Sequence, residues 1–199
     1  MLIFRALIGR PGFGLLRAAA LSAAMWGNCA AQNIAAPVEI HLPLLAKVLE
    51  YDRALKEPDN RKFMLGVIYQ SSWGPSAAVL EGVLTVAGRT SFSVRRLAVQ
   101  VVPIDVSGDA DVREFIRKYS LEILYVAPVR GISIEEIERA SEARHCRTIT
   151  GVPQFVEEGI EIGIDLRNDR PLIVINLPAA KACGADLSAQ VLRLARIVE

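Results

Sequence analysis

The stretch from residue 149 to residue 176, ITGVPQFVEEGIEIGIDLRNDRPLIVIN, decides the fold class that the sequence predicts. Aliphatic side chains alternate with polar or small ones in its middle part, at Ile160, Ile162, Ile164 and Leu166. This period of two is typical of a strand with one buried face. The polar turn 167–170 leads into an apolar run, PLIVIN. The stretch therefore predicts an antiparallel hairpin.

Upstream of the hairpin, apolar runs of strand character alternate with helical stretches. Strands are predicted over residues 63–70, 94–104, 121–128 and 146–152, and helices over residues 44–57, 75–88, 109–120 and 133–144. Strands that are joined by helical crossovers lie parallel. The pattern predicts a three-layer α/β/α sandwich with a mainly parallel sheet and an antiparallel C-terminal hairpin.

Helix ends carry weaker signals. Asp109 is a plausible N-cap, and Ser133 with Glu136 forms a capping-box pattern. A final helix is predicted from the apolar stripe of Leu187, Val191, Leu194, Ala195 and Val198.

The first 31 residues have the composition of a secretory signal peptide. Three arginines precede the apolar run Ala18–Trp26, and the small residues 29–31 follow it. This run is too short for a permanent membrane span. The sequence predicts a signal peptide over residues 1–31 and a single α/β domain over residues 32–199, located in the periplasm. The alternatives are a misassigned start codon and an N-terminal anchor.

Charge and cysteine content narrow the range of possible functions. Of 23 basic and 22 acidic residues, the leader contains three basic and no acidic ones, which leaves 20 against 22 and a formal charge of −2. That balance argues against nucleic acid as a partner. Two cysteines remain after the leader, Cys146 and Cys183. A disulfide between them fits an oxidising compartment, and two free buried thiols fit the sequence equally well.

No motif assembles a catalytic, cofactor or metal site. The chain has no phosphate-binding or dinucleotide-binding glycine loop and no G-x-S-x-G elbow. The two histidines, His41 and His145, lack the convergent partners of a zinc site. We therefore expect no catalytic residue, no cofactor and no metal.

Two groups of polar residues have both a functional and a structural interpretation. The loop after the first predicted strand could hold a small molecule through Ser71, Ser72, Trp73 and Ser76, or it is an ordinary serine-rich turn. The acidic residues Glu157, Glu158 and Glu161 could act as paired carboxylates, or they form a solvated helix end that leads into a strand. The basic pair Arg95 and Arg96 is expected to face solvent.

Residues 149–198 resemble the C-terminal half of the YfiR family. The matching positions are Thr150, Phe155-Val156-Glu157, Gly159-Ile160, Ile175-Asn176, Ala179-Ala180, Gly184, Ser188, Leu192 and Leu194-Ala195-Arg196. The resemblance extends more weakly to the first predicted helix and to the strands 63–70 and 121–128. The sequence departs from the family in its cysteines. Relatives often carry one in the first strand and one before the middle strand, and this sequence has none at either place. The end of the first helix, EYDRALKEPDN, is also more charged.

The resemblance implies a periplasmic protein without enzymatic activity that acts by protein contact. Its expected partner is the periplasmic part of an inner-membrane signalling protein, either a diguanylate cyclase or a sensor kinase. Relatives of this kind repress a cyclase, which keeps cyclic di-GMP low and limits exopolysaccharide and biofilm. Some are relieved by an outer-membrane lipoprotein, and a homodimer is plausible. The alternative function is a periplasmic small-molecule receptor that uses the Ser71–Ser76 loop.

Overall fold

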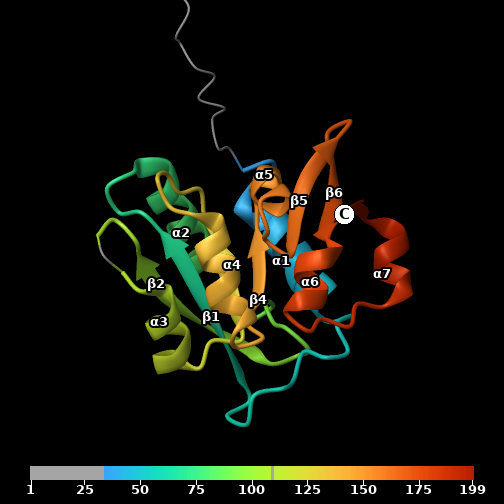
Figure 1. Cartoon of the computed structure of the whole chain (residues 1–199), viewed down its shortest axis with the longest axis horizontal. Coiled ribbons are helices and arrows are strands. Elements are labelled where there is room, and N and C mark those ends of the chain that lie inside the picture. Colours follow the sequence, from blue (N-terminus) through green and yellow to red (C-terminus); the bar gives the residue numbers. More distant parts are fainter. Residues whose placement is uncertain (1–33, 109) are drawn as a thin grey trace, which may run out of the picture. The chain divides into compact units, whose positions relative to one another are not determined.

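A seven-stranded mixed sheet organises the molecule (Figure 1). The computed structural model describes residues 34–108 and 110–199. The sheet has the order β2-β1-β3-β4-β5-β6-β7. Its strands are β1 (Lys62–Tyr69), β2 (Ala98–Asp105), β3 (Ile123–Val126), β4 (Arg147–Thr150), β5 (Ile162–Arg167), β6 (Arg170–Asn176) and β7 (Arg196–Val198).

Strand directions confirm the predicted fold class. Strands β1 to β5 pair in parallel, and β5 pairs with β6 in antiparallel register, with Ile164 opposite Ile173. The last strand, β7, runs parallel to β6. The molecule is therefore an α/β protein with a mainly parallel sheet and an antiparallel C-terminal hairpin.

Helices cover both faces of the sheet. They are α1 (Val38–Leu49), α2 (Gly74–Ala87), α3 (Val112–Tyr119), α4 (Ile134–Glu142), α5 (Pro153–Glu157), α6 (Leu177–Ala182) and α7 (Ala189–Leu194). Apolar residues of α1 and α2 share one core cluster, and those of α3 and α4 share a second one. In β3, Ile123 and Tyr125 belong to the first cluster and Leu124 and Val126 to the second. This alternation explains why a strand that is buried on both faces is apolar throughout.

Helix α1 differs from the helix predicted over residues 44–57. It begins at Val38, contains Pro43, and ends at Leu49. The chain leaves the helix because Asp52 is completely buried and forms an isolated antiparallel bridge with Leu187. A tertiary contact therefore ends the helix where the local pattern would have continued it.

Two other predicted boundaries are wrong, and one predicted cap is confirmed. Strand β2 begins at Ala98 instead of residue 94, because Arg95 and Arg96 adopt positive φ in a tight turn that links Val94 to Leu97. Helix α3 is capped by Asp111, whose side chain accepts a hydrogen bond from Arg113 N, whereas Asp109 lies outside the described residues. Ser133 caps α4 as predicted, and its side chain accepts from Glu136 N.

The C-terminal end of the chain also differs from the prediction. The apolar stripe that predicts one helix through Val198 is divided between α7 and β7. Residues Arg196–Val198 instead pair with Val174–Asn176 of β6. An unpaired sheet edge leaves backbone donors and acceptors unsatisfied, and β7 satisfies those of β6.

The predicted leader, residues 1–31, lies outside the described residues and remains a prediction. The residues that the structure describes belong to one compact unit. Within residues 34–108 and 110–199, no helix combines the length and the apolar character that a membrane span needs.

Buried His41 fixes α1 on the sheet. Its Nδ1 lies 2.7 Å from Ala36 O, and its Nε2 lies 2.7 Å from the Tyr125 hydroxyl. Burial lowers the pKa of His41, so the ring is neutral, with Nδ1 donating to the carbonyl and Nε2 accepting from Tyr125. Gly151 lies directly beneath the ring, and a Cβ there would come within 2.7 Å of His41 Cε1.

We predict that Gly151→Ala lowers the free energy of unfolding by about 1–3 kcal/mol, because two hydrogen bonds prevent His41 from moving away. Urea denaturation measures this change. Gly74→Ala is the matched control, because a Cβ at Gly74 has no neighbour within 4 Å. The control should change stability by about 0.5 kcal/mol or less. Equal effects of the two substitutions would contradict the prediction.

Candidate functional site

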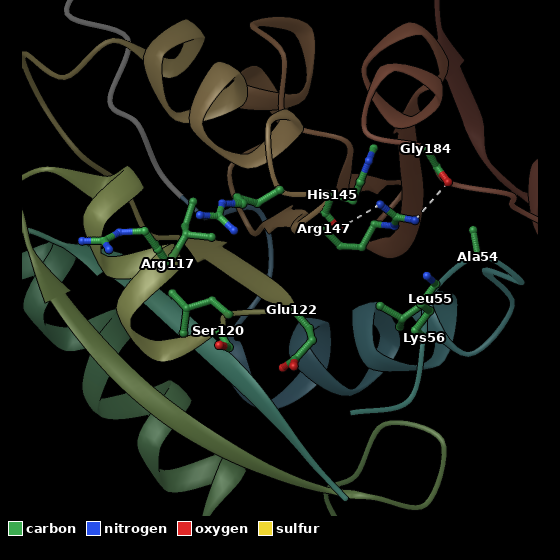
Figure 2. A pocket seen from close by; sticks show the side chains of 12 residues that line it. Ala54, Leu55, Lys56, Arg117, Ser120, Glu122, His145, Arg147 and Gly184 are labelled. Atoms are coloured by element: carbon green, nitrogen blue, oxygen red, sulfur yellow. Dashed lines mark hydrogen bonds between the residues drawn. The ribbon is translucent and has the colours of Figure 1, made fainter. Parts of the chain in front are cut away.

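A cavity of about 530 Å³ opens at the amino ends of β3 and β4 (Figure 2). Its lining comes from four parts of the chain: the segment after α1, the end of α3 with the start of β3, the loop between α4 and β4, and the turn after α6. The lining residues are Ala54, Leu55, Lys56, Ile116, Arg117, Ser120, Leu121, Glu122, Arg144, His145, Arg147 and Gly184.

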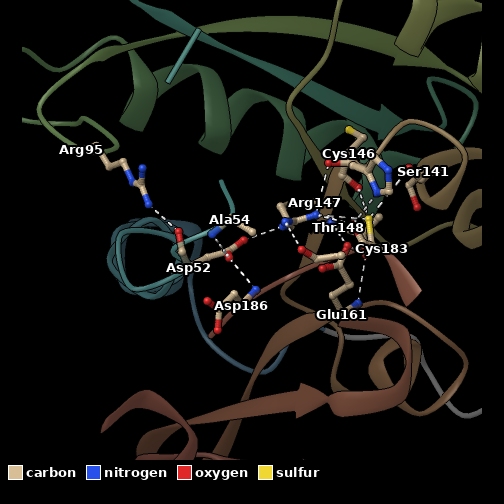
Figure 3. A network of polar contacts seen from close by, with 12 residues as sticks. Asp52, Ala54, Arg95, Ser141, Cys146, Arg147, Thr148, Glu161, Cys183 and Asp186 are labelled. Carbon is tan, nitrogen blue, oxygen red and sulfur yellow. Dashed lines mark hydrogen bonds and ion pairs between the residues drawn. The ribbon is translucent and has the colours of Figure 1, made fainter. Parts of the chain in front are cut away.

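Arg147 connects this cavity to a buried ion pair (Figure 3). Its Nε donates to Asp52 Oδ2 at 2.6 Å, and the side chains of Arg147 and Asp52 are 3% and 0% exposed. The other oxygen, Asp52 Oδ1, accepts from the backbone amides of Ala54 at 3.0 Å and Asp186 at 2.8 Å. The carboxylate is therefore held by charge and by two amides.

The rest of the guanidinium binds backbone carbonyls. Arg147 Nη1 donates to Cys183 O at 2.8 Å and to His145 O at 3.2 Å, and Nη2 donates to Gly184 O at 3.2 Å. His145 Nδ1 also donates to Cys183 O, at 2.9 Å. These bonds join the start of β4 to the turn after α6.

Arg95 belongs to the same network, contrary to the expectation that it faces solvent. Its guanidinium donates to the backbone carbonyl of Asp52, and the side chain is half-buried. Its partner in the turn, Arg96, is exposed as expected. The turn that precedes β2 therefore holds the end of α1.

Glu161 corrects the prediction of a solvated acidic group. Glu157 and Glu158 are exposed, but Glu161 is only 2% exposed. Its Oε1 accepts from Thr148 N at 3.0 Å, while Oε2 has no hydrogen-bond partner within the described residues. Burial raises the pKa of Glu161 to about 7, and the Arg147 guanidinium opposes part of this rise. Because β5 begins at Ile162, the carboxylate of Glu161 takes the place of a strand partner for β4.

The two cysteines lie next to this carboxylate, and no disulfide joins them in the structure. Both are buried, and Cys183 Sγ lies 3.3 Å from Cys146 O and 3.5 Å from Arg147 Nη1. Burial raises the pKa of both thiols, which disfavours the reactive thiolate. A Cys146–Cys183 disulfide remains a prediction.

The serine loop is bonded mainly to its own surroundings. Ser76 is completely buried, and its hydroxyl accepts from Gln70 N at 2.9 Å. Ser71 N donates to Asp105 Oδ1 at 3.1 Å, and Ser72 N donates to the Ser107 hydroxyl at 3.2 Å. The ring of Trp73 lies 4.0 Å from the Arg130 guanidinium. These contacts favour the structural interpretation, and the ligand role remains a prediction.

No group of three or more His, Cys, Asp or Glu residues within the described part of the chain is arranged to hold a metal ion. His41 and His145 lie in separate environments. His41 lies on α1 and contacts Tyr125 of β3, whereas His145 lines the cavity. The structure instead brings together residues that sequence reasoning did not select, above all Asp52, Arg147 and Glu161. No local spacing connects them, since Asp52 and Arg147 are 95 positions apart.

Comparison with known families identifies the class of protein. The family model described as YfiR/HmsC-like matches residues 84–196, from the end of α2 into β7. The chain belongs to this family. It is a family of periplasmic regulators rather than of enzymes, and membership points to cyclic di-GMP signalling.

Solved structures share the fold at low sequence identity. An ABC domain from Streptococcus pneumonia in complex with L-Trp aligns with a TM-score of 0.57 and 13% identity, over 81% of this chain and 62% of that one. A conserved domain protein from Vibrio cholerae O1 biovar El Tor gives a TM-score of 0.57 and 15% identity, over 82% and 60%. The chain thus spans about three fifths of the length of these two proteins.

An open, ligand-free substrate-binding protein with adhesive properties from Clostridium difficile gives a TM-score of 0.51 and 17% identity, over 69% of this chain and 54% of that one. Identities this low establish a common fold and nothing about ligands. A search of the curated proteins found no match.

We predict that Arg147→Met lowers the free energy of unfolding by about 3–5 kcal/mol, because it leaves the Asp52 carboxylate buried without its counter-charge. Arg53→Met is the matched control, since Arg53 pairs with Asp186 at 2.7 Å on the surface. This control should lower the free energy of unfolding by about 1 kcal/mol or less. Urea denaturation compares the two variants, and similar decreases would contradict the prediction that the buried pair contributes more than the surface pair.

The raised pKa of Glu161 predicts a pH dependence of stability. Between pH 4.5, the ordinary pKa, and about 7, the folded protein binds a proton that the unfolded chain releases. The contribution of Glu161 to the free energy of unfolding therefore falls as the pH rises through this window, by about 3 kcal/mol in total.

Glu161→Gln removes this titration and keeps the shape of the side chain. Relative to the variant, the native protein should lose about 3 kcal/mol of stability between about pH 4 and pH 8. Denaturation curves at a series of pH values test this difference. The contributions of all other titrating groups cancel, because both proteins contain them. Parallel stability profiles for the two proteins would contradict a buried, titrating Glu161.

Proposed function

We propose that this protein represses a membrane-bound diguanylate cyclase by contact with the periplasmic part of the enzyme. The observation that carries the proposal is membership of the YfiR/HmsC-like family over residues 84–196. Repression of this kind keeps cyclic di-GMP low and limits exopolysaccharide and biofilm. An outer-membrane lipoprotein that relieves the repression, and a homodimer as the active form, belong to the same proposal.

The location of the polar groups supports a binding role. The carboxylates of Asp52 and Glu161 and the thiols of both cysteines are buried among protein atoms. Groups in such positions have no access to a substrate, and their hydrogen bonds hold the fold together. A regulator that acts through its surface needs this kind of rigid interior.

We assign the contact with the cyclase to the C-terminal hairpin together with α7. Leu166 of β5 and Leu194 at the end of α7 are large apolar side chains that are 41% and 66% exposed. Leu166 lies opposite Pro171 in the hairpin, and Leu194 precedes β7, which pairs with the same β6 strand. Contiguous exposed apolar surface is typical of interaction sites, and these two side chains are our candidates for it.

The test starts from deletion of the gene, which should raise cyclic di-GMP and surface adhesion. The wild-type gene should restore both, whereas Leu166→Glu combined with Leu194→Glu should not. The matched control is Ile40→Glu with Leu44→Glu, which changes two exposed apolar side chains on α1. Immunoblots of the periplasmic fraction verify equal protein levels.

Unchanged nucleotide and unchanged adhesion after deletion would rule out cyclase repression. Loss of repression in the α1 variant, with repression kept in the hairpin variant, would move the contact to α1. Cyclic di-GMP is measured directly by mass spectrometry of cell extracts, so the outcome does not depend on the biofilm phenotype alone.

A further inference from the structure

The cavity at the amino ends of β3 and β4 concentrates positive charge (Figure 2). Lys56 follows α1, Arg117 lies on α3, and Arg144 precedes β4, and all three are exposed. None of the three takes part in an ion pair within the described residues. Arg147 adds a fourth cation at the wall of the cavity, although its charge is balanced by Asp52.

Opposing charge in the lining is small. Among the described residues, Glu122 is the single acidic one that lines the cavity, and its Oε2 already accepts a hydrogen bond from Met64 N at 2.7 Å. The lining therefore contains three cations without an ion-pair partner and one carboxylate. This excess is local, because residues 32–199 contain 20 basic and 22 acidic residues and carry a formal charge of −2. A cationic cavity on an acidic protein attracts anions selectively to that place.

Part of the lining is apolar. Leu55, Ile116 and Leu121 are buried residues that line the cavity together with the charged side chains. An apolar lining with a few polar groups is the usual arrangement of a small-molecule site, and a volume of about 530 Å³ lies within the ordinary range for such sites. A ligand with a carbon skeleton and charged groups fits this combination.

We propose that this cavity binds a small organic anion that carries two or more carboxylate or phosphate groups. The guanidinium groups of Arg117 and Arg144 offer planar pairs of N–H donors that match the oxygens of these groups, and Lys56 adds a mobile point charge. The bound anion would link α3, the loop between α4 and β4, and the segment after α1.

Isothermal titration calorimetry with the purified protein tests the proposal. The probes are citrate, which carries carboxylates, and inorganic phosphate, with glucose as the uncharged probe. Arg117→Gln combined with Arg144→Gln removes two cavity cations. Arg113→Gln combined with Arg139→Gln is the matched control, because it removes two exposed arginines of α3 and α4 that do not line the cavity.

Citrate, phosphate or both should bind, more weakly as salt is added, and the cavity variant should weaken binding about tenfold or more. The control variant should keep the affinity within about twofold. Thermal unfolding without ligand verifies that both variants are folded. Whichever probe binds identifies the preferred anionic group.

Three results would overturn the proposal: no binding of citrate or phosphate at about 10 mM, equal loss of binding in the two double variants, or binding of glucose as tight as that of the anions. The measurement needs no partner protein. Its outcome is therefore independent of whether the protein represses a cyclase.

Discussion

The buried ion pair between Arg147 and Asp52 is the constraint on which the rest of the structure depends. Neither charge can be buried alone without a large cost, so the two must meet whenever the protein is folded. Asp52 also binds the amide of Asp186, and Arg147 binds the carbonyls of Cys183 and Gly184. One salt bridge therefore fixes the end of α1, the start of β4 and the turn after α6 in a single arrangement.

The same network lies at the end of the sheet where the cavity opens. Ligands of parallel α/β sheets usually lie at the carboxyl ends of the strands. Here Asp105 Oδ1 at the end of β2 accepts from the amides of Ser71 and Ser107, so that polar groups at this edge bind one another. The cavity lies instead at the amino ends of β3 and β4, where the network around Arg147 forms one wall.

We propose separate roles for two surfaces of this member of the YfiR/HmsC-like family. The hairpin and α7 present apolar side chains that suit a protein partner, and the cavity presents cations that suit a small anion. Strands β4 and β5 are neighbours in the sheet, so both surfaces rest on the same rigid centre. The buried Glu161 carboxylate lies between these strands and makes that centre sensitive to pH.

The sequence by itself determined the order and type of most elements. Period-two alternation in β5 and the apolar run of β3 are local signals of burial, and they led directly to a mainly parallel sheet with a hairpin. Tertiary structure decided the end of α1, the strand β7, the burial of Glu161 and the meeting of Asp52 with Arg147. The reason is physical: each depends on a partner that is distant in sequence, and local periodicity contains no information about which distant group will supply the counter-charge or the hydrogen bond.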